Sequence, residues 1–266
     1  MEHLLTYLLK SSLVIGLFYC CYQMFLRNET FFKAKRWFLV SGISIALVFP
    51  LLIIKQFIET PMLQIGEKVA PTNNSIESVA VSSNPTDWWF VLGVIYAAGC
   101  VFFLTQFIIQ LFSLYRLIKK GKHNKANSFT MVEIEEDVSP FSFFNYIVFN
   151  PNKHSSEDLQ TILVHEKAHS TQKHSIDMIL AHLLCIFQWA NPFAWGYKKA
   201  ITENLEYLAD DTTTVSLNNK KEYQYLLLGE NIAPNPSIPI TNTFNNSLIK
   251  KRIVMLNKNR SHNGKF

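Results

Sequence analysis

Three long apolar runs dominate the first half of the chain. They cover residues 4–26, 37–54 and 88–115, and only the first contains a formal charge, at Lys10. About 20 apolar residues in a helix cross a hydrocarbon core about 30 Å thick. A lysine in such a helix can reach towards the nearer polar interface. The pattern therefore predicts three transmembrane helices, with the lipid bilayer as a partner.

The charges between these runs predict an orientation. Basic residues dominate the segment between the first two runs and the segment after the third, whereas acids dominate the loop 55–87. Cytoplasmic loops carry an excess of Lys and Arg. We therefore expect the amino terminus and the 55–87 loop outside, and the chain from residue 116 onwards on the cytoplasmic side. Because the net charge of +5 sits in clusters beside the apolar runs, we expect no nucleic-acid partner.

Two short strands are predicted after the third run. Residues 130–135 alternate between apolar and polar, and residues 143–149 are aromatic and β-branched. Two interpretations remain open. The strands could offer an edge to an extended peptide substrate, or they could form a small hairpin that only packs on the next helix. That helix is predicted to begin after Ser155, a capping residue followed by two acids.

The sequence HEKAH at residues 165–169 lies within this predicted helix. His165 and His169 are four residues apart and therefore share a helix face. Two such imidazoles can bind one Zn²⁺, and Glu166 can act on a water molecule beside it. The alternative is an exposed helix whose histidines have no function.

A fourth apolar stretch, residues 176–195, follows the motif. A simple crossing would carry the later residues about 30 Å away from HEKAH, too far to supply a third metal ligand. Residues 176–190 rise only about 22 Å as a helix, and the Asn191-Pro192 pair disfavours helix at its first residue. We therefore expect a helical hairpin that turns at Asn191-Pro192 and is partly embedded in the membrane or buried in the domain.

The returning arm carries several acids. Glu206 and Asp210 are four residues apart, so Glu206 is the natural third ligand and Asp210 the natural acceptor for the N–H of a ligand histidine. Glu203, one turn earlier, is a rival for the ligand position. The alternative is an acidic helix face exposed to solvent.

The rest of the chain is polar and basic. Residues 232–246 are rich in Pro and Asn and are predicted to be loop. Residues 248–256 are predicted to form a short basic helix. It could lie on the anionic inner face of the membrane or pack on the domain.

Taken together, these features resemble the BlaR/MecR-type family of membrane zinc metallopeptidases, best known as β-lactam receptors, in the form found in the Bacteroidetes branch. The likeness covers nearly the whole chain and keeps the order of its parts. It includes the three spans, the HEKAH motif, and these further matches: Ser139-Pro140-Phe141, Asp177, Trp189 to Pro192, the E-x-x-x-D of Glu206 and Asp210, and Lys250 to Ile253.

The resemblance implies a multi-pass protein of the bacterial inner membrane. Its expected fold is mainly α, with a membrane domain (1–115) followed by a zincin-like (gluzincin) α+β peptidase domain (116–266) containing a small β-hairpin and a helical hairpin. It implies Zn²⁺ held by three ligands, Glu166 as the general base, and peptide hydrolysis. The implied ligands are His165, His169 and Glu206.

The receptors of this family continue into a further span and an extracellular penicillin-binding-like sensor. This sequence ends soon after the basic helix, so we expect a member without that sensor or a truncation of a longer receptor. The favoured function is cleavage of a protein or peptide substrate, such as a cytoplasmic repressor, in transmembrane signalling. Two alternatives are a quality-control or prenyl-protein-type protease, and a non-catalytic scaffold that keeps zinc. A homo-oligomer is compatible with the sequence, which leaves the oligomeric state open.

Overall fold

The computed structural model describes residues 2–52, 88–126, 128–232 and 239–261, and most of these are helical. Three helical segments are long and apolar enough to cross a membrane: His3–Leu26, Phe32–Leu51 and Trp88–Lys120. They confirm the three predicted spans, although the second begins five residues earlier than expected and the third continues five residues further. The predicted outer loop lies outside the described residues.

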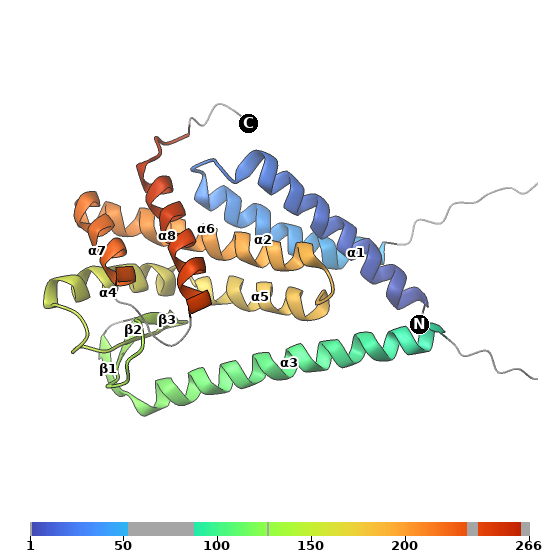
Figure 1. The fold of residues 1–266 in the computed structure, drawn as a ribbon, viewed down its shortest axis with the longest axis horizontal. Coiled ribbons are helices and arrows are strands. Elements are labelled where there is room, and N and C mark those ends of the chain that lie inside the picture. Colours follow the sequence, from blue (N-terminus) through green and yellow to red (C-terminus); the bar gives the residue numbers. More distant parts are fainter. Residues whose placement is uncertain (1, 53–87, 127, 233–238, 262–266) are drawn as a thin grey trace, which may run out of the picture.

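The first two spans form an antiparallel pair. Helix α1 (Glu2–Cys21) ends in a π-helical turn (Tyr22–Leu26), and α2 (Phe32–Val48) ends in a 3₁₀ turn at Phe49–Leu51. The amino end of α1, the carboxyl end of α2 and the amino end of α3 (Trp88–Lys120) lie towards the same end of the molecule (Figure 1). This is the arrangement that alternating spans require.

Helix α3 touches the rest of the protein along one stripe. Residues at helical spacing are partly or fully buried, and most of the others are exposed; the stripe is formed by Phe103, Phe107, Leu111, Leu114 and Ile118. A lipid-facing helix can leave large apolar side chains exposed to the hydrocarbon, so this pattern is the one expected of a span at the rim of a membrane protein.

The predicted helical hairpin is present. It consists of α5 (His174–Phe187) and α6 (Pro192–Leu217). The side chain of Asn191 accepts a hydrogen bond from the backbone N–H of Phe193, and Pro192 occupies the first turn, where its missing N–H is not needed.

The tip of this hairpin lies against the spans. The side chain of Gln188 donates to the carbonyl of Leu8 in α1, and the indole N–H of Trp189 donates to the carbonyl of Tyr96 in α3. At Gly99 an added Cβ would come within 2.3 Å of the Trp189 ring, so only glycine permits this approach. The main core joins α1, α2, α5 and α6; Tyr197 of α6, for example, donates to the carbonyl of Leu39. The division of the chain at residue 115 stays a prediction.

A small sheet precedes the HEKAH helix and has the strand order β1-β2-β4-β3. Its strands are β1 (Lys122–Ala126), β2 (Phe129–Glu133), β3 (Phe141–Phe143) and β4 (Tyr146–Phe149). Strands β2 and β4 are parallel neighbours, while β1 with β2 and β3 with β4 are antiparallel.

The expectation that the two predicted strands form the hairpin was therefore wrong. A turn at Phe144, whose φ of 49° is left-handed, interrupts the second predicted strand near its start. The rest of that strand forms β4, which pairs with β3, and β3 lies mostly before the predicted range. Strand β1 was missed because all five of its residues are exposed and its sequence lacks apolar alternation.

Helix α4 (Ser156–Thr171) carries HEKAH and begins where the sequence predicts. The Ser155 hydroxyl accepts a hydrogen bond from the N–H of Asp158. Helices α7 (Lys220–Ile232) and α8 (Pro239–Asn257) complete the described chain. The predicted basic helix lies within α8, which starts earlier than expected. Residues 239–246 are thus helical rather than loop, and 233–238 lie outside the described residues.

Candidate active site

Two packed helices, α4 and α6, bring the three predicted ligands together. The Nε2 atoms of His165 and His169 are 3.1 Å apart. The two carboxylate oxygens of Glu206 each lie 3.6 Å from one of these nitrogens. Glu203, the rival, instead forms an ion pair with Lys251 of α8. Among the described residues, the cluster that can hold a metal ion is therefore His165, His169 and Glu206.

The geometry of this cluster fits a zinc ion. A tetrahedral ion with Zn–N distances of about 2.0–2.1 Å places two ligand nitrogens about 3.3 Å apart. The observed separation of 3.1 Å between the histidine nitrogens is close to that value. Two histidines and one carboxylate are also a donor set typical of catalytic zinc, because they leave a fourth position open. The metal-binding role of the three residues stays a prediction.

Opposite charges stabilise one another within the cluster. Burial lowers the pKa of His165, but the carboxylates of Glu206 and Asp210 outweigh burial and leave the pKa raised. Burial raises the pKa of Glu206, but His165 and Arg252 outweigh it, and the pKa falls well below its usual range. Burial lowers the pKa of His169 to about 4. The metal-free site therefore keeps Glu206 ionised and favours a proton on His165.

The expected contact between Asp210 and a ligand histidine is made through a third residue. The Oδ1 atom of Asp210 is 3.5 Å from Nδ1 of His165, and the Tyr223 hydroxyl contacts both atoms. It is 2.8 Å from Nδ1 of His165 and donates to Asp210 over 2.6 Å. If the hydroxyl hydrogen serves Asp210, the hydroxyl oxygen accepts the Nδ1 proton of His165. This leaves Nε2 free to bind a metal ion.

Arg252 of α8 completes this arrangement. Its guanidinium donates to both oxygens of Asp210, over 2.9 and 2.6 Å, and to the Tyr223 hydroxyl over 3.1 Å. Another of its nitrogens lies 3.0 Å from a carboxylate oxygen of Glu206. A single cation thus holds two carboxylates in place, the buried Asp210 and the partly buried candidate ligand Glu206.

The other ligand histidine has its own partner. Nδ1 of His169 lies 2.7 Å from Nδ1 of His174, whose Nε2 lies 3.2 Å from the side-chain oxygen of Gln172. Burial lowers the pKa of His174 to about 3, so it stays neutral and can accept the Nδ1 proton of His169. Arg36 of α2 donates to the backbone carbonyl of Gln172 and pairs with Asp177 at 2.6 Å, which connects a membrane span to this part of the site.

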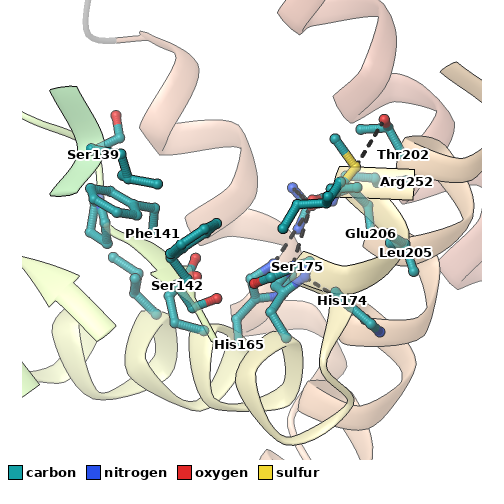
Figure 2. Close-up of a pocket in the computed structure, with 18 of the residues that line it drawn as sticks. Ser139, Phe141, Ser142, His165, His174, Ser175, Thr202, Leu205, Glu206 and Arg252 are labelled. Atoms are coloured by element: carbon teal, nitrogen blue, oxygen red, sulfur yellow. Dashed lines mark hydrogen bonds and ion pairs between the residues drawn. The ribbon is translucent and has the colours of Figure 1, made fainter. Parts of the chain in front are cut away.

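A cavity of about 530 Å³ opens in front of the cluster and includes Glu166 in its lining. Phe141 and Ser142 lie on one side of the cavity, and Glu206 and Arg252 lie on the other (Figure 2). Phe141 and Ser142 belong to β3, the last strand in the order of the sheet. An extended peptide can add to such an edge.

Two serines, one in the last turn of α4 and one in the first turn of α5, fix this strand beside the cavity. The N–H of Phe144 donates to the hydroxyl of Ser175 over 2.8 Å, and the hydroxyl of Ser170 donates to the carbonyl of Phe144. The turn between β3 and β4 is therefore bonded to the connection between α4 and α5. The interpretation of the strands as an edge next to the metal helix agrees with this position.

A sequence profile of the BlaR1 peptidase M56 family matches residues 9–256. The chain belongs to this family. The match covers most of the first membrane helix, all of the other two and every residue of the cluster, and it places the chain among membrane metallopeptidases. No curated protein matches the chain.

Three residues of this M56 site were not found by sequence reasoning. Tyr223 stands in a polar helix without a motif, and His174 follows HEKAH without a recognised spacing. Arg252 was noticed as part of a basic helix and of the Lys250 to Ile253 match, but no role at the site was assigned to it. The structure supports packing for this helix, because Lys251 and Arg252 both pair with acids of α6.

Proposed function

We propose that this M56 peptidase is a zinc-dependent endopeptidase that acts in transmembrane signalling by cleaving a regulatory protein, such as a cytoplasmic repressor. One observation carries the proposal. His165, His169 and Glu206 form a set of donors with zinc-compatible spacing, and Glu166 lines the same cavity. A purely structural zinc site does not need that glutamate.

The residues of the chain would divide the reaction as follows. When bound, a zinc ion supplies Lewis-acid activation of the scissile carbonyl and of the attacking water. Glu166 accepts the proton of that water and later delivers it to the leaving amine. Tyr223 and His174 hold the ligand imidazoles in the tautomers that direct Nε2 towards the metal position. Strand β3 holds the substrate backbone beside the metal position.

The expected orientation places the catalytic cavity on the cytoplasmic side. Two features support it. The helix ends expected outside, which are the amino ends of α1 and α3 and the carboxyl end of α2, lie towards one end of the molecule, whereas the HEKAH helix lies towards the other (Figure 1). The basic residues Arg116, Lys119 and Lys120 at the carboxyl end of α3 lie near the sheet, as the positive-inside rule requires of a cytoplasmic face.

The test is Glu166→Gln in the full chain in membranes. We expect the variant to keep its zinc, because the ligands are unchanged, and to lose cleavage of candidate repressors by at least about 100-fold. Glu157→Gln, an exposed acid in the first turn of the same helix, is the matched control and should retain cleavage. Signalling that is unchanged in Glu166→Gln would support a non-catalytic scaffold. Indiscriminate cleavage of misfolded membrane proteins by the wild type would support a quality-control protease.

A further inference from the structure

The catalytic cavity extends away from the metal ligands along one face of α5. Its lining on this helix runs from His174 and Ser175 through Met178 and Ile179 to His182. The eight helical steps from His174 to His182 rise about 12 Å. The facing wall comes from α3, whose residues Phe107, Gln110, Leu111 and Leu114 also line the cavity. The cavity thus runs between a membrane span and the helical hairpin.

We call the part of the cavity between α3 and α5 the slot. Contacts at two positions along α3 mark its ends. At one end the ring of Phe107 stacks on His182, with centroids 5.1 Å apart. At the other end Leu114 packs on the sheet cluster that includes Phe141. The seven helical steps from Phe107 to Leu114 rise about 10 Å. This length can admit an extended chain, since neighbouring strands lie about 4.8 Å apart.

The position of the slot along α3 places it at the surface of the bilayer. The stretch from Trp88 to Phe107 is about 20 residues long and rises about 30 Å, the thickness of the hydrocarbon core. The basic end of α3 follows directly after Leu114. Between these two positions the outer face of α3 remains apolar and exposed, with Ile108 and Ile109 at 55% and 61%. The slot therefore opens at the level of the interface on the basic side of α3.

We propose that this protease also accepts as substrate an apolar juxtamembrane segment of a membrane-anchored polypeptide, which enters between α3 and α5 at the bilayer surface and lies extended along β3. The proposal rests on the endopeptidase function proposed above. Three observations favour it: the apolar walls at Leu111, Met178 and Ile179, the interfacial level of the slot, and its continuity with Glu166 and strand β3. A segment tethered to the same membrane reaches this level without leaving the interface, and tethering raises its effective concentration.

The test uses the purified full chain, loaded with zinc, in liposomes. The probe is a quenched fluorescent peptide containing a short run of Phe and Leu, made with and without an amino-terminal transmembrane helix. We expect kcat/KM to be at least about tenfold higher for the anchored peptide. Leu111→Trp, which narrows the slot, should lower the cleavage of the anchored peptide at least about tenfold at unchanged zinc content. Ile108→Trp, on the exposed face of α3, should leave the cleavage of the anchored peptide unchanged. The two variants together therefore separate entry through the slot from an effect of tethering alone.

A second measurement does not depend on catalysis. In zinc-loaded Glu166→Gln, a photo-crosslinking amino acid at Gln110 should label the anchored peptide strongly, whereas the same group at Ile109 should label it weakly. Equal labelling at the two positions, or a Leu111→Trp variant that cleaves the anchored peptide normally, would overturn the proposal. Cleavage of both peptides at equal rates would also overturn it and leave the endopeptidase function standing. Labelling at Gln110 without cleavage by the wild type would instead overturn the endopeptidase function.

Discussion

Removing the hydroxyl of Tyr223 is expected to weaken zinc binding without removing a ligand. In Tyr223→Phe the Nδ1 proton of His165 loses its acceptor at 2.8 Å, and the nearest oxygen of Asp210 is 3.5 Å away, too far for a good hydrogen bond. A buried donor left without a partner costs about 1–3 kcal/mol. Groups that orient a metal ligand are typically worth about 10–100-fold in metal affinity. We therefore expect zinc affinity to fall about 10–100-fold, or about 1.4–2.8 kcal/mol.

The measurement is competition between the protein and a fluorescent zinc chelator, with the full chain in lipid nanodiscs. The matched control is Tyr197→Phe. The Tyr197 hydroxyl is also buried and donates a hydrogen bond of 2.8 Å, but its acceptor is the carbonyl of Leu39, away from the site. This control should lose stability and retain its zinc affinity. A Tyr223→Phe variant that binds zinc within about twofold of the wild type would show that the hydroxyl does not orient His165.

Two further predictions concern the ligand set and its protons. Glu206→Ala should lower zinc occupancy far more than Glu203→Ala, because the Glu203 carboxylate pairs with a lysine of α8. The measurement is metal analysis of the purified variants. The reverse order would mean that Glu203, not Glu206, is the ligand. Burial lowers the pKa of His169 to about 4 and of His174 to about 3, so in chelator the folded state stays neutral at these two residues while the unfolded state takes up protons below about pH 6.5. The raised pKa of His165 stabilises the folded protein at low pH, but it is one residue against two. The Tm of the zinc-free protein should therefore be lower at pH 5 than at pH 7. A higher Tm at pH 5 would contradict this prediction.

The parts of the fold that follow from periodicity and reach could be predicted from the sequence. The spans are visible because lipid requires long uncharged runs. The helical hairpin followed from a distance argument: Glu206 could reach His165 only if the apolar stretch turned back at Asn191-Pro192, and α5 and α6 form that hairpin. The chemistry of the motif and the limits of helix geometry were sufficient for this step.

The sheet and the residues behind the ligands could not be predicted in the same way. The pairing of β2 with β4 depends on a left-handed turn at Phe144. Phenylalanine rarely adopts this conformation, so the sequence does not predict the turn. Tyr223 and Arg252 reach the site only through the rotation and packing of α7 and α8. Short polar helices of this kind have several faces of similar polarity, and periodicity does not select among them.

The charges of the site explain why these residues occur together. The carboxylates of Glu206 and Asp210 lie within 3.6 Å of His165, in a part of the protein where unbalanced charge is costly. Arg252 pairs with both carboxylates and offsets one of their two negative charges. The remaining charge raises the pKa of His165 despite its burial. A proton on His165 and a bound dication such as Zn²⁺ would compensate the same negative charge, so zinc binding should weaken as the pH falls.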